Sequence, residues 1–218
     1  DSKKNLISIL SKHRSYPMNL IPSGLLERFS SQAYIILVSS FFGVGNAGQL
    51  NLYQRTVSFP IRIIGKAIGD VFRRYAASSL NARGEAKKLF IITLCGTAIL
   101  ALPVFIPLKF YGIQIFEFIF GSQWTLAGEY AQLLSWIFLF SFTVSPLSNL
   151  ILIGGFPRYD LYLQTYLSLG IALALYFGWS SGSIFDFIKV YVIVYCIKYI
   201  IEGIVCWRIA SGSLKIKI

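Results

Sequence analysis

The chain has 218 residues, of which 56% are hydrophobic and only 13% charged, and its mean hydropathy is +0.66. A water-soluble globule of this length would struggle to bury so large an apolar fraction, so the composition indicates a polytopic membrane protein. The net charge of +11 does not predict nucleic-acid binding, because the basic residues cluster in linkers between apolar runs and no aromatic-rich basic module accompanies them.

Six apolar runs divide the chain and predict an all-α, six-transmembrane-helix bundle. A β-barrel is excluded because its strands would be shorter and would alternate apolar and polar residues. The predicted spans cover residues 21–42, 47–77, 89–108, 130–153, 159–179 and 184–207. The bundle therefore occupies residues 21–208, between a basic leader (1–20) and a short tail (209–218).

Prolines and aromatic residues mark the irregular places. Pro60 lies at the centre of the second span and should kink it, because proline removes one backbone hydrogen bond. Pro146 lies inside the fourth span. Residues 110–127 alternate aromatic, polar and glycine residues, which is too broken for a span and predicts an interfacial segment anchored by Trp124 and Tyr130.

The basic residues also predict the orientation of the bundle. They gather in the leader, in the linker between the second and third spans, at Arg158 and in the tail, whereas Lys109 alone is expected near the opposite face. Cytoplasmic loops carry the excess of lysine and arginine, so both termini are predicted to be cytoplasmic, in a bacterial inner membrane. The chain starts at Asp1 and its only methionine is Met18, so we expect a piece of a longer protein.

The sequence offers no basis for a catalytic or metal site. Cys95, Cys196 and Cys206 fall inside apolar runs, and His13 is the one histidine, so neither a zinc site nor a histidine-based cluster is predicted. Nucleotide-binding loops and hydrolase motifs are also missing from the sequence. We therefore expect no enzyme activity, no cofactor and no ATP-driven transport.

Polar residues inside the spans are the main functional signal, because an ionised side chain in lipid costs at least about 3 kcal/mol on insertion scales. A wheel drawn at about 100° per residue places five polar residues of the second span in one stripe. The first span adds Glu27, Arg28 and Gln32. The predicted substrate path consists of Arg28, Gln32, Asn51, Arg55, Arg62 and Lys66, with Asp70 at the end of the stripe.

Two local alternatives stay open at this point. Lys66 and Asp70 could form a pair, or Arg62 and Lys66 could extend towards the membrane surface. Lys198 and Glu202 stand four residues apart in the sixth span, which is typical of a neutral pair within a helix. A proton relay there is poorly supported, because no histidine or second carboxylate lies nearby in the sequence.

Several short motifs resemble one transporter family. They include Tyr16-Pro17 and Ile21-Pro22-Ser23-Gly24 before the first span, Tyr53-Gln54-Arg55 and Phe59-Pro60 in the second, Phe120-Gly121-Ser122-Gln123-Trp124, and Ser145-Pro146-Leu147-Ser148. Together they make residues 14–208 similar to the C-terminal half of Wzx-type polysaccharide flippases, in the multidrug/oligosaccharidyl-lipid/polysaccharide export superfamily.

The resemblance implies one half of a two-bundle transporter that moves undecaprenyl-diphosphate-linked sugar repeat units across the cytoplasmic membrane for polysaccharide or O-antigen biosynthesis. Its partners would be the lipid-linked oligosaccharide, an N-terminal six-helix half missing here, the lipid bilayer and a polysaccharide polymerase. Alternatives are a cation-coupled drug antiporter of the same superfamily, a membrane subunit of a polysaccharide-synthesis enzyme, or an inactive truncated fragment.

Overall fold

The computed structural model describes residues 15–214, apart from the side chains of residues 15–17, 31–33, 81 and 83. Every regular element in this part of the chain is a helix, which confirms the all-α prediction. The predictions made for the leader up to Arg14, including His13, and for Lys215 and Lys217 lie outside the described residues.

Six helices of at least 20 residues and several shorter pieces form the bundle within the described residues. The α-helices are α2 (Ser15–Phe42), α3 (Val44–Tyr53), α4 (Phe59–Arg83), α5 (Lys87–Phe120), α6 (Thr125–Val144), α7 (Asn149–Ile153), α8 (Pro157–Ser181) and α9 (Ile184–Ala210). Three short helical turns connect them: a π-turn, η1 (Gln54–Ser58), and the 3₁₀ turns η2 (Ser122–Trp124) and η3 (Ser145–Ser148). Each predicted span therefore corresponds to a helix or to two helices joined end to end.

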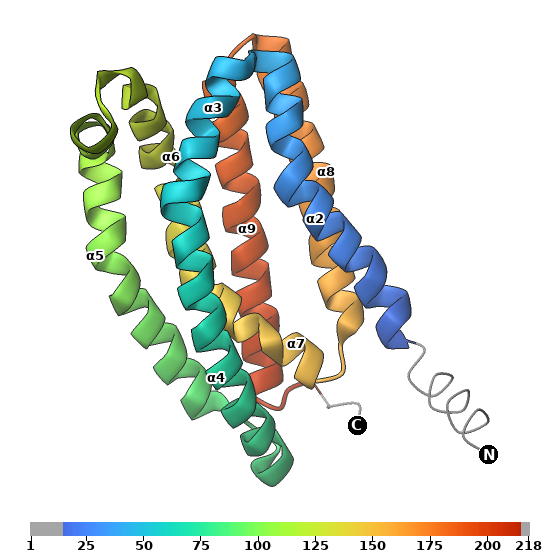
Figure 1. The fold of residues 1–218 in the computed structure, drawn as a ribbon. Coiled ribbons are helices and arrows are strands. Elements are labelled where there is room, and N and C mark those ends of the chain that lie inside the picture. The colour runs from blue at the N-terminus through green and yellow to red at the C-terminus, as the bar shows by residue number, and fades with distance from the viewer. Residues whose placement is uncertain (1–14, 215–218) are drawn as a thin grey trace, which may run out of the picture.

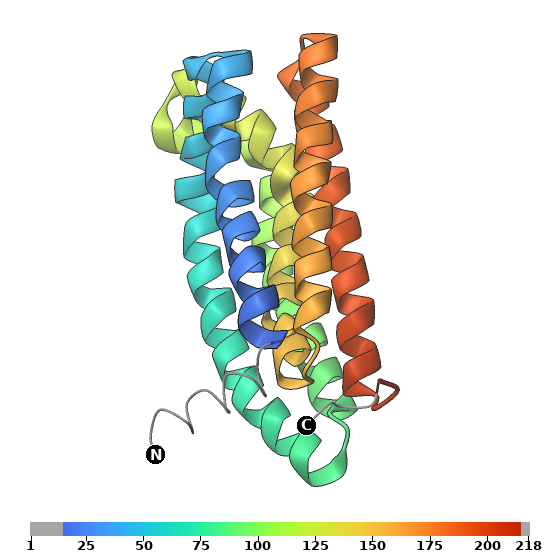
Figure 2. The same cartoon turned by 90° about the vertical axis from the view of Figure 1, so that its right-hand side faces the viewer.

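The helices run roughly alongside one another and form an elongated bundle (Figure 1, Figure 2). Helix α8 packs on α2 and on α9, and α6 packs on α5 and α9. Helices α3 and α4 follow one another along the length of the bundle, and Figure 1 shows α4 and α2 separating towards the lower end of the view. The predicted polar residues lie on α2, α3, η1 and α4.

The second predicted span is interrupted by the π-turn η1 rather than by a simple kink at Pro60. Proline has no N–H to donate to the carbonyl of Thr56, and its ring would clash with that carbonyl in a regular α-helix. The widened turn at Gln54–Ser58 comes directly before Phe59, where α4 begins with Pro60 in its first turn. A proline in the first turn of a helix leaves no intrahelical bond unmade, so the π-turn is the local solution to Pro60.

The segment predicted to be too broken for a span is helical as far as Phe120, which corrects the sequence-based picture of residues 110–127. Helix α5 changes direction at Tyr111, whose backbone angles (φ −124°, ψ 18°) are not helical. The part after this kink lies across one end of the bundle, seen end-on in Figure 1 and from the side in Figure 2. Gly112 and Gly128 allow it to contact α6, since a Cβ on Gly128 would lie 2.6 Å from the Cα of Ile113.

Pro146 ends a helix instead of lying within one. Helix α6 stops at Val144, and the 3₁₀ turn η3 leads into the short α7. Helix α4 packs against η3 at Gly69, where an added Cβ would lie 3.3 Å from the Cα of Pro146. The side-chain amide of Asn149 donates to the carbonyl oxygen of Gly69 at 3.2 Å. The two elements therefore pack closely at Gly69, while Gly65, one turn earlier in α4, has more room.

The surface of the bundle is that of a membrane protein. Large apolar side chains are exposed along the whole length of α5, from Ile91 to Phe118, which is 91% exposed. Of the six predicted spans, three are long and apolar enough to cross a membrane within the described residues, namely Lys87–Phe120, Ser122–Ile153 and Pro157–Ser181. The other three predicted spans, at α2, at α3 and α4 and at α9, contain the polar residues discussed below.

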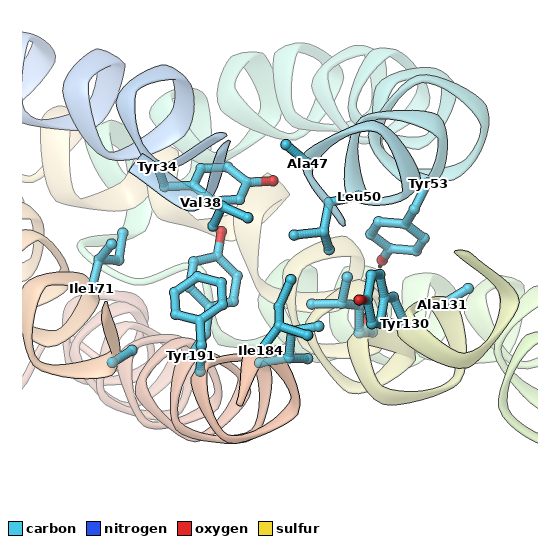
Figure 3. Packing of buried hydrophobic residues seen from close by; sticks show 14 of the residues in the cluster. Tyr34, Val38, Ala47, Leu50, Tyr53, Tyr130, Ala131, Ile171, Ile184 and Tyr191 are labelled. Atoms are coloured by element: carbon cyan, nitrogen blue, oxygen red, sulfur yellow. Dashed lines mark hydrogen bonds between the residues drawn. The ribbon is translucent and has the colours of Figure 1, made fainter. Parts of the chain in front are cut away.

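Two main apolar clusters make up the interior. The upper cluster includes Tyr34, Leu50, Tyr130 and Tyr191 and joins α2, α3, α6, α8 and α9 (Figure 3). The lower cluster includes Phe72, Phe90, Leu150 and Ile209 and joins α4, α5, α7 and α9. On α9 the upper cluster extends to Val194 and the lower cluster begins at Cys206. The buried charged residues of α9 lie between these two points.

Candidate functional site

The predicted cationic residues lie on three elements. Arg28 is exposed on α2, Arg55 is exposed in the π-turn, and Arg62 and Lys66 are exposed on α4. Asn51 is partly buried on α3, and Asp70 is exposed on α4. The side chain of Gln32 is not among those described, so its predicted place in the path remains a prediction.

The π-turn divides the predicted stripe into two parts. Because an i→i+5 turn accommodates one extra residue, everything after it is rotated by about 100° from the position that a continuous α-helix would give. Asn51 and Arg55 lie before or within the turn, whereas Arg62, Lys66 and Asp70 lie after it. The wheel drawn from the sequence therefore has the wrong register across Pro60, and the residues form two neighbouring groups.

Arg62 points its charge towards α2 and α9. It is close enough to act electrostatically on Tyr34 of α2 and on Tyr195 of α9. Glu27 of α2 also acts on Tyr195, with the opposite sign. A cation of α4 and a carboxylate of α2 therefore both lie within electrostatic reach of a tyrosine of α9.

The tyrosines form a continuous row. The ring of Tyr34 lies 5.3 Å from that of Tyr191, and Tyr191, Tyr195 and Tyr199 follow one another along one face of α9 with centroids 4.6 and 6.2 Å apart. Figure 3 shows the upper end of this row, with Tyr34 and Tyr191 next to each other. Each ring offers an apolar face and a hydroxyl group, so the row provides both apolar contact and hydrogen bonding.

The cations of α4 are not neutralised by neighbouring acids. The ion pairs found among the described side chains are Lys87–Glu85, Lys189–Asp186 and Lys198–Glu202. None of them involves Arg55, Arg62 or Lys66. The local pair between Lys66 and Asp70 that the sequence left open is thus not formed, and the positive charges of this face are available to an anion.

Lys198 and Glu202 form the pair expected from their spacing, with Nζ and Oε2 2.8 Å apart, and both side chains are buried. The ammonium group also lies 4.3 Å from the ring centre of Tyr199. What the sequence did not reveal is that Glu27 of α2 and Asp160 of α8 lie near enough to act electrostatically on Glu202. These carboxylates are distant along the chain, and only the packing of α2, α8 and α9 brings them together.

A second polar contact holds α2 to α8. The hydroxyl of the buried Ser23 donates to the carboxylate of Asp160, and the hydroxyls of Ser30 and Ser168 lie 2.9 Å apart. A small cavity of about 40 Å³ lies higher in the bundle, lined by Tyr34, Tyr53, Gln54 and Tyr191 among others. This volume suits one or two water molecules. It adjoins the π-turn, whose Gln54 donates to the hydroxyl of Tyr34.

Residues 5–128, more than half of the chain, match a family model described as a polysaccharide biosynthesis protein. The chain belongs to this family. It is also similar to the teichuronic acid biosynthesis protein TuaB of Bacillus subtilis (strain 168), with 21% identity over 181 residues. That alignment covers 83% of this chain but only 38% of the relative. No solved structure matches the chain.

Membership of this family confirms the resemblance drawn from the motifs at the level of a polysaccharide biosynthesis and flippase family. It also supports a role in polysaccharide synthesis or export at a membrane. The match includes α2, α3, the π-turn and α4. The two elements that carry Arg55 and Arg62, η1 and α4, thus lie within the matched residues.

Proposed function

We propose that the chain is one half of a transporter that flips an undecaprenyl-diphosphate-linked oligosaccharide across the bacterial cytoplasmic membrane. The observation that carries the proposal is the set of exposed cations on η1 and α4, Arg55, Arg62 and Lys66, with no ion-pair partner among the described side chains. In a site of low dielectric, charge-assisted hydrogen bonds from arginine to a diphosphate are stronger than at a water-exposed surface. The tyrosines beside Arg62 add apolar faces and hydroxyl groups that suit sugar rings.

The length of the relative and the distribution of basic residues extend the proposal. The relative is more than twice as long as this chain, since the 181 aligned residues are 38% of it, so a second bundle would face α2 and α4 and complete the path. The basic ends of the helices would be cytoplasmic, as would both termini. The protein would act as a transporter without catalytic residues, next to a polysaccharide polymerase.

Arg62 is the residue to test first. The complete gene product that contains this chain is expressed in a bacterium lacking its own O-antigen flippase, and surface polysaccharide is quantified. Losing one charge-assisted contact costs about 1.5–3 kcal/mol, so Arg62→Ala should lower export about tenfold or more. Arg62→Lys keeps the charge and should retain more of the export.

Arg74→Ala is the matched control, because Arg74 is exposed on the same helix three turns further on. It should leave export unchanged. Immunoblots of the membrane fraction establish equal protein levels for all variants. Full export by Arg62→Ala at normal levels, together with full export by Arg55→Ala, would overturn the proposal, and export of a cationic drug instead of polysaccharide would favour the antiporter.

A further inference from the structure

The bundle contains a buried polar layer between its two apolar clusters. We define the polar layer by six residues on three helices: Ser23 and Glu27 of α2, Asp160 and Gln164 of α8, and Lys198 and Glu202 of α9. Four of them, Ser23, Gln164, Lys198 and Glu202, are buried. Such a layer is costly in a membrane protein and usually has a function.

The contacts between helices place these residues at one level. Ser23 meets Asp160 and Ser30 meets Ser168, so α2 and α8 run in parallel and Gln164 is level with Glu27. Gly170 of α8 packs against Val194 of α9, and these two helices are antiparallel. Gln164, six residues before Gly170, is therefore level with about residue 200, which lies between Lys198 and Glu202.

Gln164 has an unsatisfied acceptor. Its side-chain oxygen, Oε1, is fully buried and has no hydrogen-bond partner in the described structure, and the residue is only 7% exposed. A buried carbonyl oxygen without a donor costs about 1–3 kcal/mol. Among the buried side-chain atoms of the described residues, this oxygen alone is left in that state. Gln164 lies level with the Lys198–Glu202 pair, so a donor supplied by that pair in another state of the protein would satisfy this oxygen.

The charges of the layer do not balance. Lys198 is the one cation of the polar layer, against the carboxylates of Glu27, Asp160 and Glu202. The other groups that face Glu202 are the hydroxyl of Tyr199 and the thiol of Cys206 on its own helix. Val144 of α6, which contacts Gly203, adds only apolar surface. The buried pair itself is neutral, but the half-buried Asp160 and the exposed Glu27 add negative charge beside it, and negative neighbours favour proton uptake by a carboxylate.

We propose that Glu202 is a proton-binding site, at which the protonated carboxyl donates a hydrogen bond to Oε1 of Gln164 while the ammonium of Lys198 turns to Asp160 and Glu27. The step is a simple protonation, in which a carboxylate and one proton give a carboxyl group, and no electrons move. Because Lys198 and Glu202 belong to α9, whereas Asp160 belongs to α8 and Glu27 to α2, protonation shifts an ion pair from within α9 to between α9 and its neighbours. Proton binding by itself does not depend on the proposed function, but its use to drive export rests on it.

Infrared difference spectroscopy tests the site directly. The complete gene product is reconstituted in lipid nanodiscs and spectra are recorded across a pH titration at constant sodium. A carboxylic C=O band should appear as the pH falls and should be missing in Glu202→Gln. In Gln164→Leu the band should persist, but its midpoint should move to lower pH by about one unit, because the protonated form loses a hydrogen bond.

Two further variants keep the test decisive if Glu202→Gln does not fold. Asp160→Asn removes a neighbouring negative charge and should also lower the midpoint, whereas Gln132→Leu, a glutamine of α6 outside the layer, should not change it. A band that persists in Glu202→Gln, or a midpoint unaffected by both Gln164→Leu and Asp160→Asn, would overturn the proposal. A spectrum that responds to sodium at fixed pH, but not to pH, would do the same. Export of polysaccharide is measured in parallel, so that a failure of the proton-binding proposal is distinguished from a failure of the proposed function.

Discussion

Lys198 and Glu202 show how much a single buried residue depends on its partner. The pair is buried with 2.8 Å between Nζ and Oε2, and removing one member of such a pair typically costs about 3–5 kcal/mol because the other charge stays buried. Lys198→Met should therefore lower the free energy of unfolding by about 3 kcal/mol. The double variant Lys198→Met/Glu202→Met should recover most of this loss, since apolar residues of similar size replace both charges. Tryptophan fluorescence during urea or SDS unfolding in detergent micelles measures both.

The stabilities of the single and the double variant can be compared directly, because Lys198 is replaced by Met in both. If the double variant were less stable than the single one, the pair would not be the source of the cost. Lys189→Met provides the exposed control, since the pair that Lys189 forms with Asp186 lies on the surface. Exposed pairs contribute about 0–1 kcal/mol, so this change should be nearly neutral.

At the scale of the elements, the kinked end of α5 depends on two glycines. A Cβ on Gly128 would lie 2.6 Å from the Cα of Ile113 and 2.7 Å from the carbonyl oxygen of Gly112, and both are backbone atoms that cannot turn away. Gly128→Ala should therefore destabilise the protein by about 1–3 kcal/mol. Gly96 lies inside α5, and a Cβ added there would have nothing within 4 Å. Gly96→Ala should therefore be neutral or stabilise the protein by up to about 1 kcal/mol. Thermal unfolding in detergent ranks the two, and equal losses would contradict this account.

The positions of the helices could be predicted from the apolar runs in the sequence, but the internal geometry of the helices could not. The six spans correspond to observed helices because a run of about twenty apolar residues has few other solutions in a membrane. Pro60 and Pro146 predicted irregularities but not their kind, since one produces a π-turn and the other a 3₁₀ turn. The kink at Tyr111 comes one turn after Pro107, and the close contact that follows it is made possible by Gly112 and Gly128, which is a tertiary effect.

The candidate site could likewise be predicted only in part. The exposed cations of α4 were visible because ionised residues are rare in apolar spans. Their register was wrong, because a helical wheel assumes a constant turn and cannot include η1. The polar layer was missed because its carboxylates are far apart in the sequence. Glu27 and Asp160 are separated by more than a hundred residues, and Asp160 and Glu202 by about forty. Proximity in sequence is therefore a poor test for a carboxylate cluster in a bundle.

Considered as a whole, the molecule has two chemically different ends. At one end, the linker between α4 and α5 is tied to the end of α9, where the N–H of Ala86 donates to the carbonyl of Ala210 at 2.8 Å. At the other end, the side chain of Gln49 bridges the turn before α6, donating to the carbonyl of Gln123 and accepting from the N–H of Ala127. The exposed basic residues gather at the first end: Arg73, Arg74, Lys87, Lys88, Arg158 and Arg208. Towards the second end lie Lys109 and also Lys189, which the sequence-based count omitted and which Asp186 neutralises.

This asymmetry predicts the orientation of the bundle, because short loops rich in lysine and arginine remain on the cytoplasmic side. Single cysteines at Ser122 and Ser213, both exposed and at opposite ends, are introduced into the complete gene product after Cys95, Cys196 and Cys206 are replaced by alanine. Ser122→Cys should react with a membrane-impermeant maleimide in intact spheroplasts, and Ser213→Cys only after permeabilisation. Labelling of both without permeabilisation would mean an even number of crossings between them or a porous preparation, which a cytoplasmic marker protein distinguishes. The reverse pattern would place the cations of α4 on a path that opens first to the outside, and would contradict loading of the diphosphate from the cytoplasm.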